Sequence, residues 1–415
     1  MKLRNNSKLL ENTILLIVFF TSSFLKLTKI NNVEYKYDQQ FSFNVLQNCK
    51  IENLLSGNLD FLFINSSSGI PQGPLHYKIE CIFGLLGVSN YITFLQIKII
   101  ASQIMIIFIY LIIRKSITKN VAIAVITFLF LNPYLIISSR NISSVYNYEF
   151  FIIVFLILFI NRKKSKSFSF FYGLISSLSF AIYFPYIIYT STLNFVFVLK
   201  DGFKNFTSIV IGYLLGIVMN IILYLPVKDL ITLSNLNQSK SWGVSSYWRI
   251  MLEFMSGNSL QNKINSSFDR NLLNSDFPLN GWLYQMNNIF ILALLMYGIY
   301  KLIINLYKNL LDDFDVAFLS ILIISGLLFT LLDRPLYPHY YFFTTVFLYI
   351  FILKPIKHSL SLTLITFTFA ITSIFLITNF HSYIDQNKGA STSDYGKHFN
   401  SCGSFEDDAR VCSGQ

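Results

Sequence analysis

The stretch ITFLQIKIIASQIMIIFIYLII, residues 92–113, contains a single charged residue, Lys98. A helix needs about 20 mostly apolar residues to cross the hydrocarbon layer of a bilayer, so this stretch predicts a transmembrane helix. Ten further runs of the same character occur in the chain, some of them shorter. The eleven predicted spans are Leu9–Leu25, Ile92–Ile113, Val121–Ile137, Glu149–Ile160, Phe170–Tyr183, Tyr186–Leu199, Ser208–Leu225, Asn287–Ile304, Asp315–Leu332, Tyr341–Leu353 and Leu360–Asn379.

The composition points to the same class of protein. Of the 415 residues, 53% are hydrophobic and 13% are charged, about half of the ~25% charged fraction of a soluble domain. Such a chain is neither disordered nor an ordinary soluble enzyme. The first run is read as a span and not as a signal peptide, because ten such runs follow it and no small-residue cleavage site does. We therefore expect an all-α polytopic membrane protein with about 11 transmembrane helices.

Basic residues are distributed unevenly over the connecting segments. Cytoplasmic loops of membrane proteins are rich in Lys and Arg, and half of the 32 basic residues lie in short turns on one side of the alternating spans. These are Lys2, Arg4, Lys8, Arg114, Lys115, Lys119, Arg162, Lys163, Lys164, Lys166, Lys200, Lys204, Lys301, Lys308, Lys354 and Lys357. We expect a cytoplasmic N-terminus, an extracytoplasmic C-terminus and a location in a bacterial inner membrane. The net charge of +11 then records orientation, and no nucleic-acid partner is expected.

The polar mass of the chain lies on the predicted outer face, in residues 26–91, 226–285 and 380–415. We divide the chain into a transmembrane domain, residues 1–379, and an extracytoplasmic tail, residues 380–415. The inner loops are all short, so the function is expected on the outer face. The three tryptophans, Trp242, Trp248 and Trp282, all belong to the second outer segment, where we interpret them as an interfacial aromatic belt.

The first outer loop contains the residue that we expect to be catalytic, Asp38. An amphipathic stretch at Phe41–Leu55 predicts a helix on the membrane surface. A Gly- and Pro-rich loop follows at residues 66–77 and leads into Ile79–Val88, which we read as a juxtamembrane or re-entrant helix. A carboxylate just outside a span can act as a general base or hold a divalent cation. The alternative for Asp38 is a solvated helix N-cap.

The motifs of this loop carry a family resemblance. An acid shortly after the first span, a surface helix ending in Gly-Asn and the sequence Gly-x-Pro-x-Gly-Pro-Leu-x-Tyr resemble the membrane glycosyltransferases of the GT-C class. They are most similar to bacterial relatives of the dolichyl-phosphate-mannose-protein mannosyltransferase family (glycosyltransferase family 39). The resemblance implies a GT-C-like bundle with Asp38 as the catalytic base and Pro74, Leu75 and Tyr77 at the floor of the site. Many members have a second acid where this chain has Gln39, so the role of that second acid cannot be assigned to a residue of this chain.

Two other outer loops add candidate substrate-binding residues. Arg140 is the only cation of its loop and can bind a phosphate with its guanidinium fork; the alternative is an interfacial Arg that meets lipid headgroups. In the late loop, Arg334 is expected to bind phosphate, and His339 and Tyr340 are expected to contact sugar or phosphate. The alternative there is an Asp333–Arg334 pair beside an aromatic belt. Family members have similar sequences in both of these loops, and this resemblance supports the choice of these residues. Some family members have an acid near the position of Asn147; the nearest acid here is Glu149, an imperfect match, so we rank Glu149 low. His76, next to Tyr77, is added to the substrate-binding set.

Together these residues predict a transferase that moves a sugar from a polyprenyl-phosphate donor to a hydroxyl of a glycan, lipid or protein acceptor, with inversion. No ATP-binding loop, His-Glu-x-x-His or Cys-x-x-Cys motif occurs. No cofactor and no metal site are assigned, although the sequence leaves open whether a divalent cation is needed. The alternatives are a secondary transporter or flippase for a lipid-linked solute and a non-catalytic subunit of a polysaccharide assembly complex. Four cysteines allow three disulfide pairings, among them Cys402–Cys412, and all four are expected outside.

Overall fold

All regular structure in the described part of the chain is helical. The computed structural model describes residues 2–30, 46, 48–51, 74–88, 90–140, 148–201, 203–225, 245–260, 278–331 and 338–386. The α-helices are α1 (Lys2–Leu27), α4 (Pro74–Leu85), α5 (Tyr91–Ile113), α6 (Lys119–Leu131), α7 (Pro133–Ser138), α8 (Tyr148–Asn161), α9 (Lys166–Ile182), α10 (Phe184–Asp201), α11 (Phe203–Tyr224), α12 (Ser245–Ser256), α14 (Pro278–Tyr307), α15 (Asp313–Leu319), α16 (Gly326–Leu331), α17 (Thr345–Leu353) and α18 (Ser359–Gln386). Short 3₁₀ helices lie at η5 (Asn258–Leu260) and η8 (Pro338–Tyr341), and η7 (Ser320–Ser325) is a π-helix. The expected all-α class is confirmed for these residues.

Six helical segments of the described residues are long and apolar enough to cross a membrane. They are Leu9–Leu27, Ile92–Ile113, Asn205–Tyr224, Gln285–Tyr307, Asp313–Leu331 and Ser359–Ser382. Each coincides with one of the predicted spans, which supports a polytopic membrane protein. The count of about 11 is not confirmed, because the other five predicted spans coincide with the shorter helices α6, α8, α9, α10 and α17.

One of these shorter elements shows why a long apolar run does not give a long helix. The run Val121–Ile137 divides into α6 and α7 at Asn132-Pro133. Proline has no backbone N–H and cannot continue a helix from the preceding turn. The Asn132 side chain instead accepts from the N–H of Leu135, at 2.9 Å, and begins α7. Hydropathy alone does not register this break.

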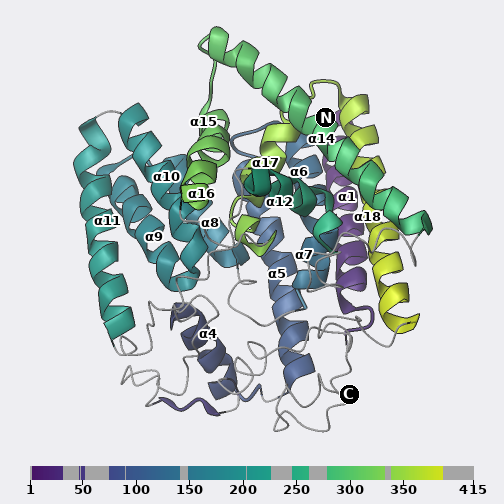
Figure 1. Ribbon diagram of the computed structural model, residues 1–415, viewed down its shortest axis with the longest axis horizontal. Helices are drawn as coiled ribbons and strands as arrows, with labels where there is room; N and C mark the ends of the chain where they lie inside the picture. Colours follow the sequence, from purple (N-terminus) through teal and green to yellow (C-terminus); the bar gives the residue numbers. More distant parts are fainter. Residues whose placement is uncertain are drawn as a thin grey trace.

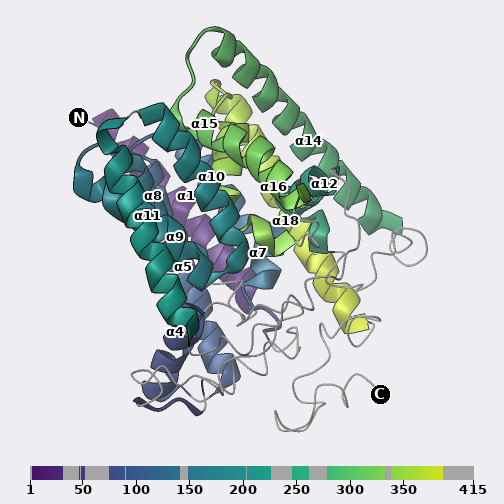
Figure 2. The ribbon, with the colours of Figure 1, turned by 60° about the vertical axis from the view of Figure 1, so that its left-hand side comes forward.

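The helices run between two ends of a bundle (Figure 1). We call the end at which α1 begins the proximal end and the end at which α1 finishes the distal end. Helices α9, α10 and α11 lie together on one side, and α9 packs closely against both of the others. Helices α1, α14 and α18 lie on the other side in this view, with α6, α12 and α17 between the two groups; in the turned view of Figure 2, α14 and α18 again lie apart from α9 and α11.

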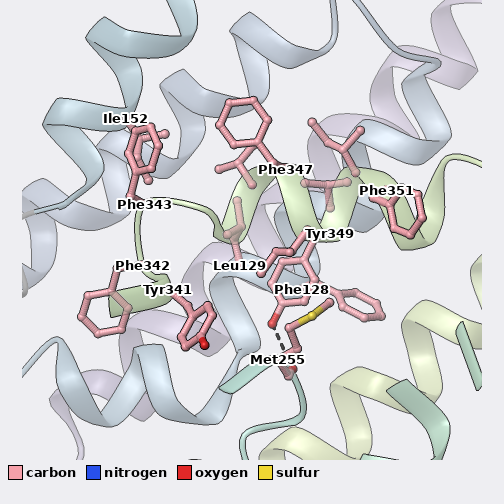
Figure 3. Close-up of a cluster of buried hydrophobic side chains, with 14 of the residues drawn as sticks. Phe128, Leu129, Ile152, Met255, Tyr341, Phe342, Phe343, Phe347, Tyr349 and Phe351 are labelled. Carbon is pink, nitrogen blue, oxygen red and sulfur yellow. Dashed lines mark hydrogen bonds between the residues drawn. The ribbon is translucent and has the colours of Figure 1, made fainter. Parts of the chain in front are cut away.

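The core lies around α17, all nine residues of which are buried. Aromatic rings fill it (Figure 3): Phe343 and Phe347 pack edge-on against Phe155 of α8, with ring centroids 4.9 and 6.4 Å apart. Phe128 of α6 stacks on Phe369 of α18 at 3.8 Å. These contacts join helices from all parts of the chain, because a large apolar ring reaches across the space between two helix backbones.

Helix α12, from the predicted outer segment 226–285, packs against this core and carries one of the three tryptophans, Trp248. Trp248 packs against the core, and its Nε1 donates to the carbonyl of Leu322 at 3.1 Å. Tyr247 donates to the carbonyl of Ile321 at 2.9 Å. Both acceptors belong to the π-helix η7, in which the wider turn disturbs the regular backbone bonding. Trp242 lies outside the described residues, and the side chain of Trp282 is not described.

The C-terminal end of α12 is buried and is capped by side chains. The amide of Asn132 donates to the carbonyls of Phe254 and Met255, at 3.0 and 3.3 Å, and the Tyr349 hydroxyl donates to Met255 at 3.1 Å (Figure 3). Gly257 follows with a φ of +79°, the left-handed conformation that ends many helices. A buried helix end without such partners would leave carbonyl groups unpaired.

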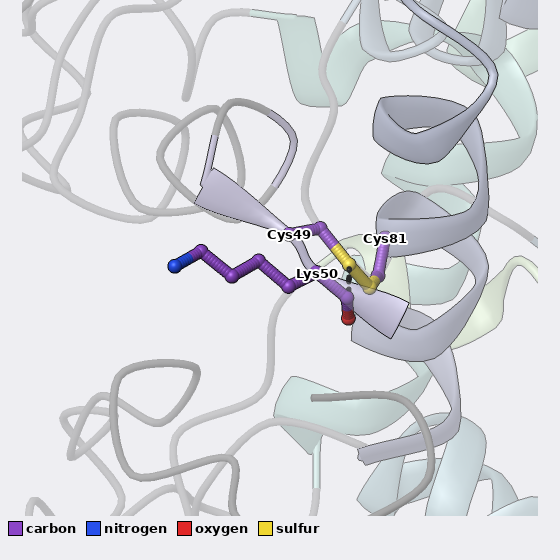
Figure 4. Close-up of a disulfide and its surroundings, with 3 residues drawn as sticks. All are labelled: Cys49, Lys50 and Cys81. Atoms are coloured by element: carbon purple, nitrogen blue, oxygen red, sulfur yellow. Dashed lines mark hydrogen bonds between the residues drawn. A yellow bond between two sulfur atoms is a disulfide. The ribbon is translucent and has the colours of Figure 1, made fainter. Parts of the chain in front are cut away.

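At the distal end, α4 is formed by residues of the predicted first outer loop. The motif residues Pro74, His76 and Tyr77 lie in the first turn of α4 and not in a loop, since the helix begins at Pro74, five residues before the expected start at Ile79. A disulfide joins Cys81 of α4 to Cys49, with the Cα atoms 5.2 Å apart (Figure 4). Most of the predicted surface helix Phe41–Leu55 lies outside the described residues, as do Cys402 and Cys412.

Candidate functional site

The structure describes some of the expected site residues and not others. Asp38 and Arg334 lie outside the described residues, so their convergence with Arg140 stays a prediction. The backbone of His76 and Tyr77 is placed on α4, and their side chains are not described. Three expected substrate-binding residues are described with their side chains: Arg140, His339 and Tyr340.

Arg140 is held at the distal end of α1. Its side chain is 1% exposed, and its guanidinium donates to the carbonyls of Leu25, Thr28 and Lys29 at 2.6, 2.6 and 3.2 Å. The last carbonyls of a helix have no partner within the helix, and a cation at this end also complements the helix dipole. Arg140 therefore caps α1, a role that neither sequence interpretation included.

Arg140 also brings α18 to the end of α1. One of its terminal nitrogens lies 2.8 Å from Nε2 of His381. Because a guanidinium nitrogen only donates, this imidazole nitrogen must accept, and His381 is held as the neutral form with its proton on Nδ1. A phosphate that bound Arg140 would have to share it with these acceptors.

A buried cluster of ionisable residues lies beside this cap. Glu149, at the first turn of α8, is 6% exposed, and Lys26, in the last turn of α1, is 1% exposed. The Ser102 hydroxyl of α5 donates to the Glu149 carboxylate, which lies within electrostatic range of both Lys26 and Lys98. We call Lys26, Lys98, Ser102 and Glu149 the Glu149 cluster. Charged groups in such a setting are costly to bury unless they are paired.

This cluster was not assembled by the sequence analysis. Lys98 was noted as a charge inside a span, Lys26 was counted with the outer loop, and Glu149 was ranked low. Lys26 and Glu149 lie in the distal turn of their helices, and Lys98 lies two turns inside α5 from its distal end. How far a residue lies from the end of its helix can be counted from the sequence once the helix ends are known. For the short helices, the predicted ends were the least accurate part of the sequence analysis.

A series of packed aromatic rings connects His339 and Tyr340 to the region of the Glu149 cluster. Tyr183 packs against His339 and Tyr340, each with ring centroids 5.9 Å apart, and against Tyr186 at 5.2 Å. Tyr186 stands at the distal end of α10, stacks on Phe151 at 5.9 Å and lies within electrostatic range of Glu149. The expected residues His339 and Tyr340 and the cluster therefore share the distal end.

Ion pairs of a different kind join the short turns at the proximal end. Arg162 is 1% exposed and donates to Asp201 at 2.7 Å and to Asp313 at 2.8 Å. Lys163 lies 3.0 Å from Asp201, and Lys200 lies 2.8 Å from Asp313. We call Arg162, Lys163, Lys200, Asp201 and Asp313 the Asp313 network. It brings together turns that the distribution of basic residues had placed on one side.

A second group of charges lies at the proximal end. Glu11, inside the predicted span Leu9–Leu25, is buried. Its carboxylate pairs with Arg114 at 2.9 Å and with Lys119 at 2.8 Å, and it accepts from the Tyr110 hydroxyl. These contacts fasten the start of α1 to the turn between α5 and α6. Within the described residues, no group of three His, Cys, Asp or Glu side chains is arranged to hold a metal ion.

The distal end can therefore bind an anion and hold a proton acceptor close to it. Lys26, Lys98 and Arg140 supply positive charge, and Glu149 supplies a carboxylate in the same buried region. The family expectation rests on the motif residues, of which Asp38 and Arg334 lie outside the described residues.

Compared with models of protein families, with curated proteins and with solved structures, the chain matches none of them.

Proposed function

We propose that this chain is a membrane glycosyltransferase that uses a polyprenyl-phosphate sugar as donor and works at the distal end of the bundle, on the outer face of the membrane. The observation that carries the proposal is that the buried Lys26 and the half-buried Lys98 lie within electrostatic range of the buried Glu149 carboxylate, and that Lys26 directly follows Leu25, whose carbonyl Arg140 caps. A donor that arrives through the lipid would present its phosphate at this depth. The motif resemblance supplies the choice of a sugar as the group transferred.

The chemistry needs a positive site for the leaving group and a base for the acceptor. The bond between the sugar carbon and the phosphate oxygen breaks while the acceptor oxygen bonds to the same carbon from the opposite side. Lys26 and Lys98 would neutralise the phosphate as its charge develops, which is the larger part of catalysis in such sites. The acceptor proton passes to a carboxylate, for which Asp38 is the proposed residue. Glu149 would hold the two lysines in place before the donor arrives.

The test is sugar transfer from a polyprenyl-phosphate donor in membranes that contain the full chain. Asp38→Asn should reduce kcat by about 10²–10⁴-fold, the contribution of a general base. Lys98→Met should raise the KM for the donor, because one of the cations of the phosphate site is lost. Lys163→Met is the matched control: it removes a lysine at the proximal end, and transfer should not change.

Three results would contradict the proposal at different points. Transfer that persists in Asp38→Asn would remove Asp38 as the base. An unchanged donor KM in Lys98→Met would show that the Glu149 cluster is not the phosphate site. Absence of transfer from every polyprenyl-phosphate sugar, with the purified chain folded, would overturn the glycosyltransferase itself.

A transporter is the second candidate, and one observation favours it. Buried polar side chains run along the facing sides of α9 and α10, between the two charged ends. Transporters place polar groups within the membrane to carry ions and protons. An ordinary membrane-anchored enzyme needs none at this depth.

A further inference from the structure

The side of α9 that faces α10 is polar along its whole length. Ser169, Tyr172, Ser176 and Ser179, followed by Tyr183 at the C-cap, are spaced three and four residues apart and are buried. Residues at this spacing lie on one face of a helix. At 1.5 Å per residue the stripe extends about 21 Å, most of the thickness of a bilayer's hydrocarbon layer.

Helix α10 presents a matching side. Tyr186, Thr190 and Asn194 are each four residues apart and buried, and Asp201 closes the row at the proximal end. The hydroxyls of Ser179 and Thr190 are 2.9 Å apart, and Ser176 donates to the side-chain oxygen of Asn194 at 3.3 Å. We call the residues of the two rows the polar seam; they are Ser169, Tyr172, Ser176, Ser179, Tyr183, Tyr186, Thr190, Asn194 and Asp201.

Three polar groups of the seam have no hydrogen-bond partner in the described part of the protein. They are the hydroxyls of Tyr172 and Tyr186 and the amide nitrogen of Asn194. Each residue is more than nine-tenths buried. A buried polar group without a partner costs about 1–3 kcal/mol, and polar interiors satisfy such groups with water. Seam positions three or four residues apart lie about 4.5–6 Å apart along the helix axis, a step that one water with two hydrogen bonds of about 2.8 Å can bridge. The seven-residue step from Asn194 to Asp201 is about 10.5 Å and needs more than one water.

The seam lies between the charged groups at the two ends of the bundle. At the distal end, Tyr186 stacks at 5.9 Å on Phe151, which follows Glu149 by two positions on α8. At the proximal end, Tyr172 lies within range of Arg162, Asp201 and Asp313, and Ser169 donates to the backbone carbonyl of Arg162 at 2.6 Å. The seam therefore extends from the region of one carboxylate to another.

We propose that the polar seam is hydrated and that protons pass along it between the carboxylates of Glu149 and Asp201. Each water or hydroxyl accepts one proton and donates another, so a proton that enters at one carboxylate is matched by a proton that leaves at the other. No group of the chain is changed by a complete passage. This activity does not depend on sugar transfer, and it can be tested without any sugar.

Hydration is tested by hydroxyl-radical footprinting of the full chain in detergent, in ¹⁸O-labelled water. Radicals form at bound water, so Tyr172 and Tyr186 should be labelled although they are buried. Tyr349 is the matched control: it is equally buried, but its hydroxyl is bonded to the Met255 carbonyl. Labelling of Tyr172 and Tyr186 that does not exceed that of Tyr349 would overturn the proposal.

Proton passage is tested in vesicles that contain the full chain and a trapped pH-sensitive dye. An imposed potassium diffusion potential should drive protons across the wild-type vesicles. Tyr172→Phe should reduce the flux to that of empty vesicles and should still fold, because its ring contacts with Phe155 and Phe159 remain. Tyr297→Phe, on a lipid-exposed part of α14, should leave the flux unchanged. A seam that is labelled but carries no flux, or a flux that Tyr172→Phe does not alter, would overturn proton passage.

Discussion

The two ends of the bundle each bury an arginine, and they hold it in different ways. At the proximal end, Arg162 is held by the carboxylates of Asp201 and Asp313 and lies over the ring of Phe197, 4.0 Å from its centroid. At the distal end, Arg140 is held by the backbone carbonyls of Leu25, Thr28 and Lys29 and by His381.

The difference concerns what each cation can still do. A carboxylate neutralises an arginine, so the Asp313 network acts as a fastening between the ends of α8 and α10 and the start of α15. A carbonyl or a neutral imidazole satisfies the N–H groups but leaves the positive charge in place. These contacts of Arg140 are uncharged, whereas those of Arg162 are anionic, and the proposed phosphate site adds the positive charge of Lys26 and Lys98 at the same end. The following predictions test this comparison, from the largest expected effect to the smallest.

Removal of Arg162 should have the largest effect on stability. Arg162→Met leaves Asp201, which is 3% exposed, as a buried carboxylate without its guanidinium, and losing one partner of a buried ion pair costs about 3–5 kcal/mol. Unfolding of the purified chain in detergent measures the loss. Lys163→Met, in which a side chain 49% exposed leaves the same network, should cost less than about 1 kcal/mol. Equal effects of the two variants would mean that the Asp313 network is not a fastening.

Removal of Arg140 should have a smaller effect on stability but should separate two roles. Arg140→Met frees three carbonyls at the end of α1, and hydrogen bonds from a charged group contribute about 1.5–3 kcal/mol each at most, so we expect a loss of about 3 kcal/mol after water replaces part of them. If Arg140 only caps α1, sugar transfer per folded molecule should be unchanged. A loss of transfer in Arg140→Lys at wild-type stability would instead assign the guanidinium to the phosphate.

Removal of Lys354, at the exposed edge of the proximal end, should have the smallest effect on stability. Lys354 is 27% exposed and pairs with Asp315 at 2.9 Å and also with Asp312. Pairs of this exposure contribute about 0.2–1 kcal/mol, so Lys354→Met should lower stability only slightly. That loss should disappear in 1 M salt, where the Debye length is about 3 Å, whereas the effect of Arg162→Met should persist. A Lys354 effect that resists salt would show that this pair is screened from solvent.

The sequence determined the all-α class, the six helices that are long and apolar enough to cross a membrane, and the positions of the basic turns. These properties follow from local composition, because about 20 apolar residues are enough to place a helix in a bilayer and a cluster of Lys and Arg is enough to orient a turn. The helix at Ile79–Val88 was also recognised, although it begins earlier, at Pro74. The broken run at Asn132-Pro133 was read as one span, because its apolar character continues through the break.

Tertiary structure alone decided which polar groups meet. Helix α12 enters the core because Asn132 and Tyr349, from distant parts of the chain, cap its end. Glu149 meets Lys26 and Lys98 because three helices bring their distal ends together. Sequence hydropathy counts the cost of burying a charge or a carbonyl but contains no information about its partner, and in a membrane interior the partner decides whether that cost is met.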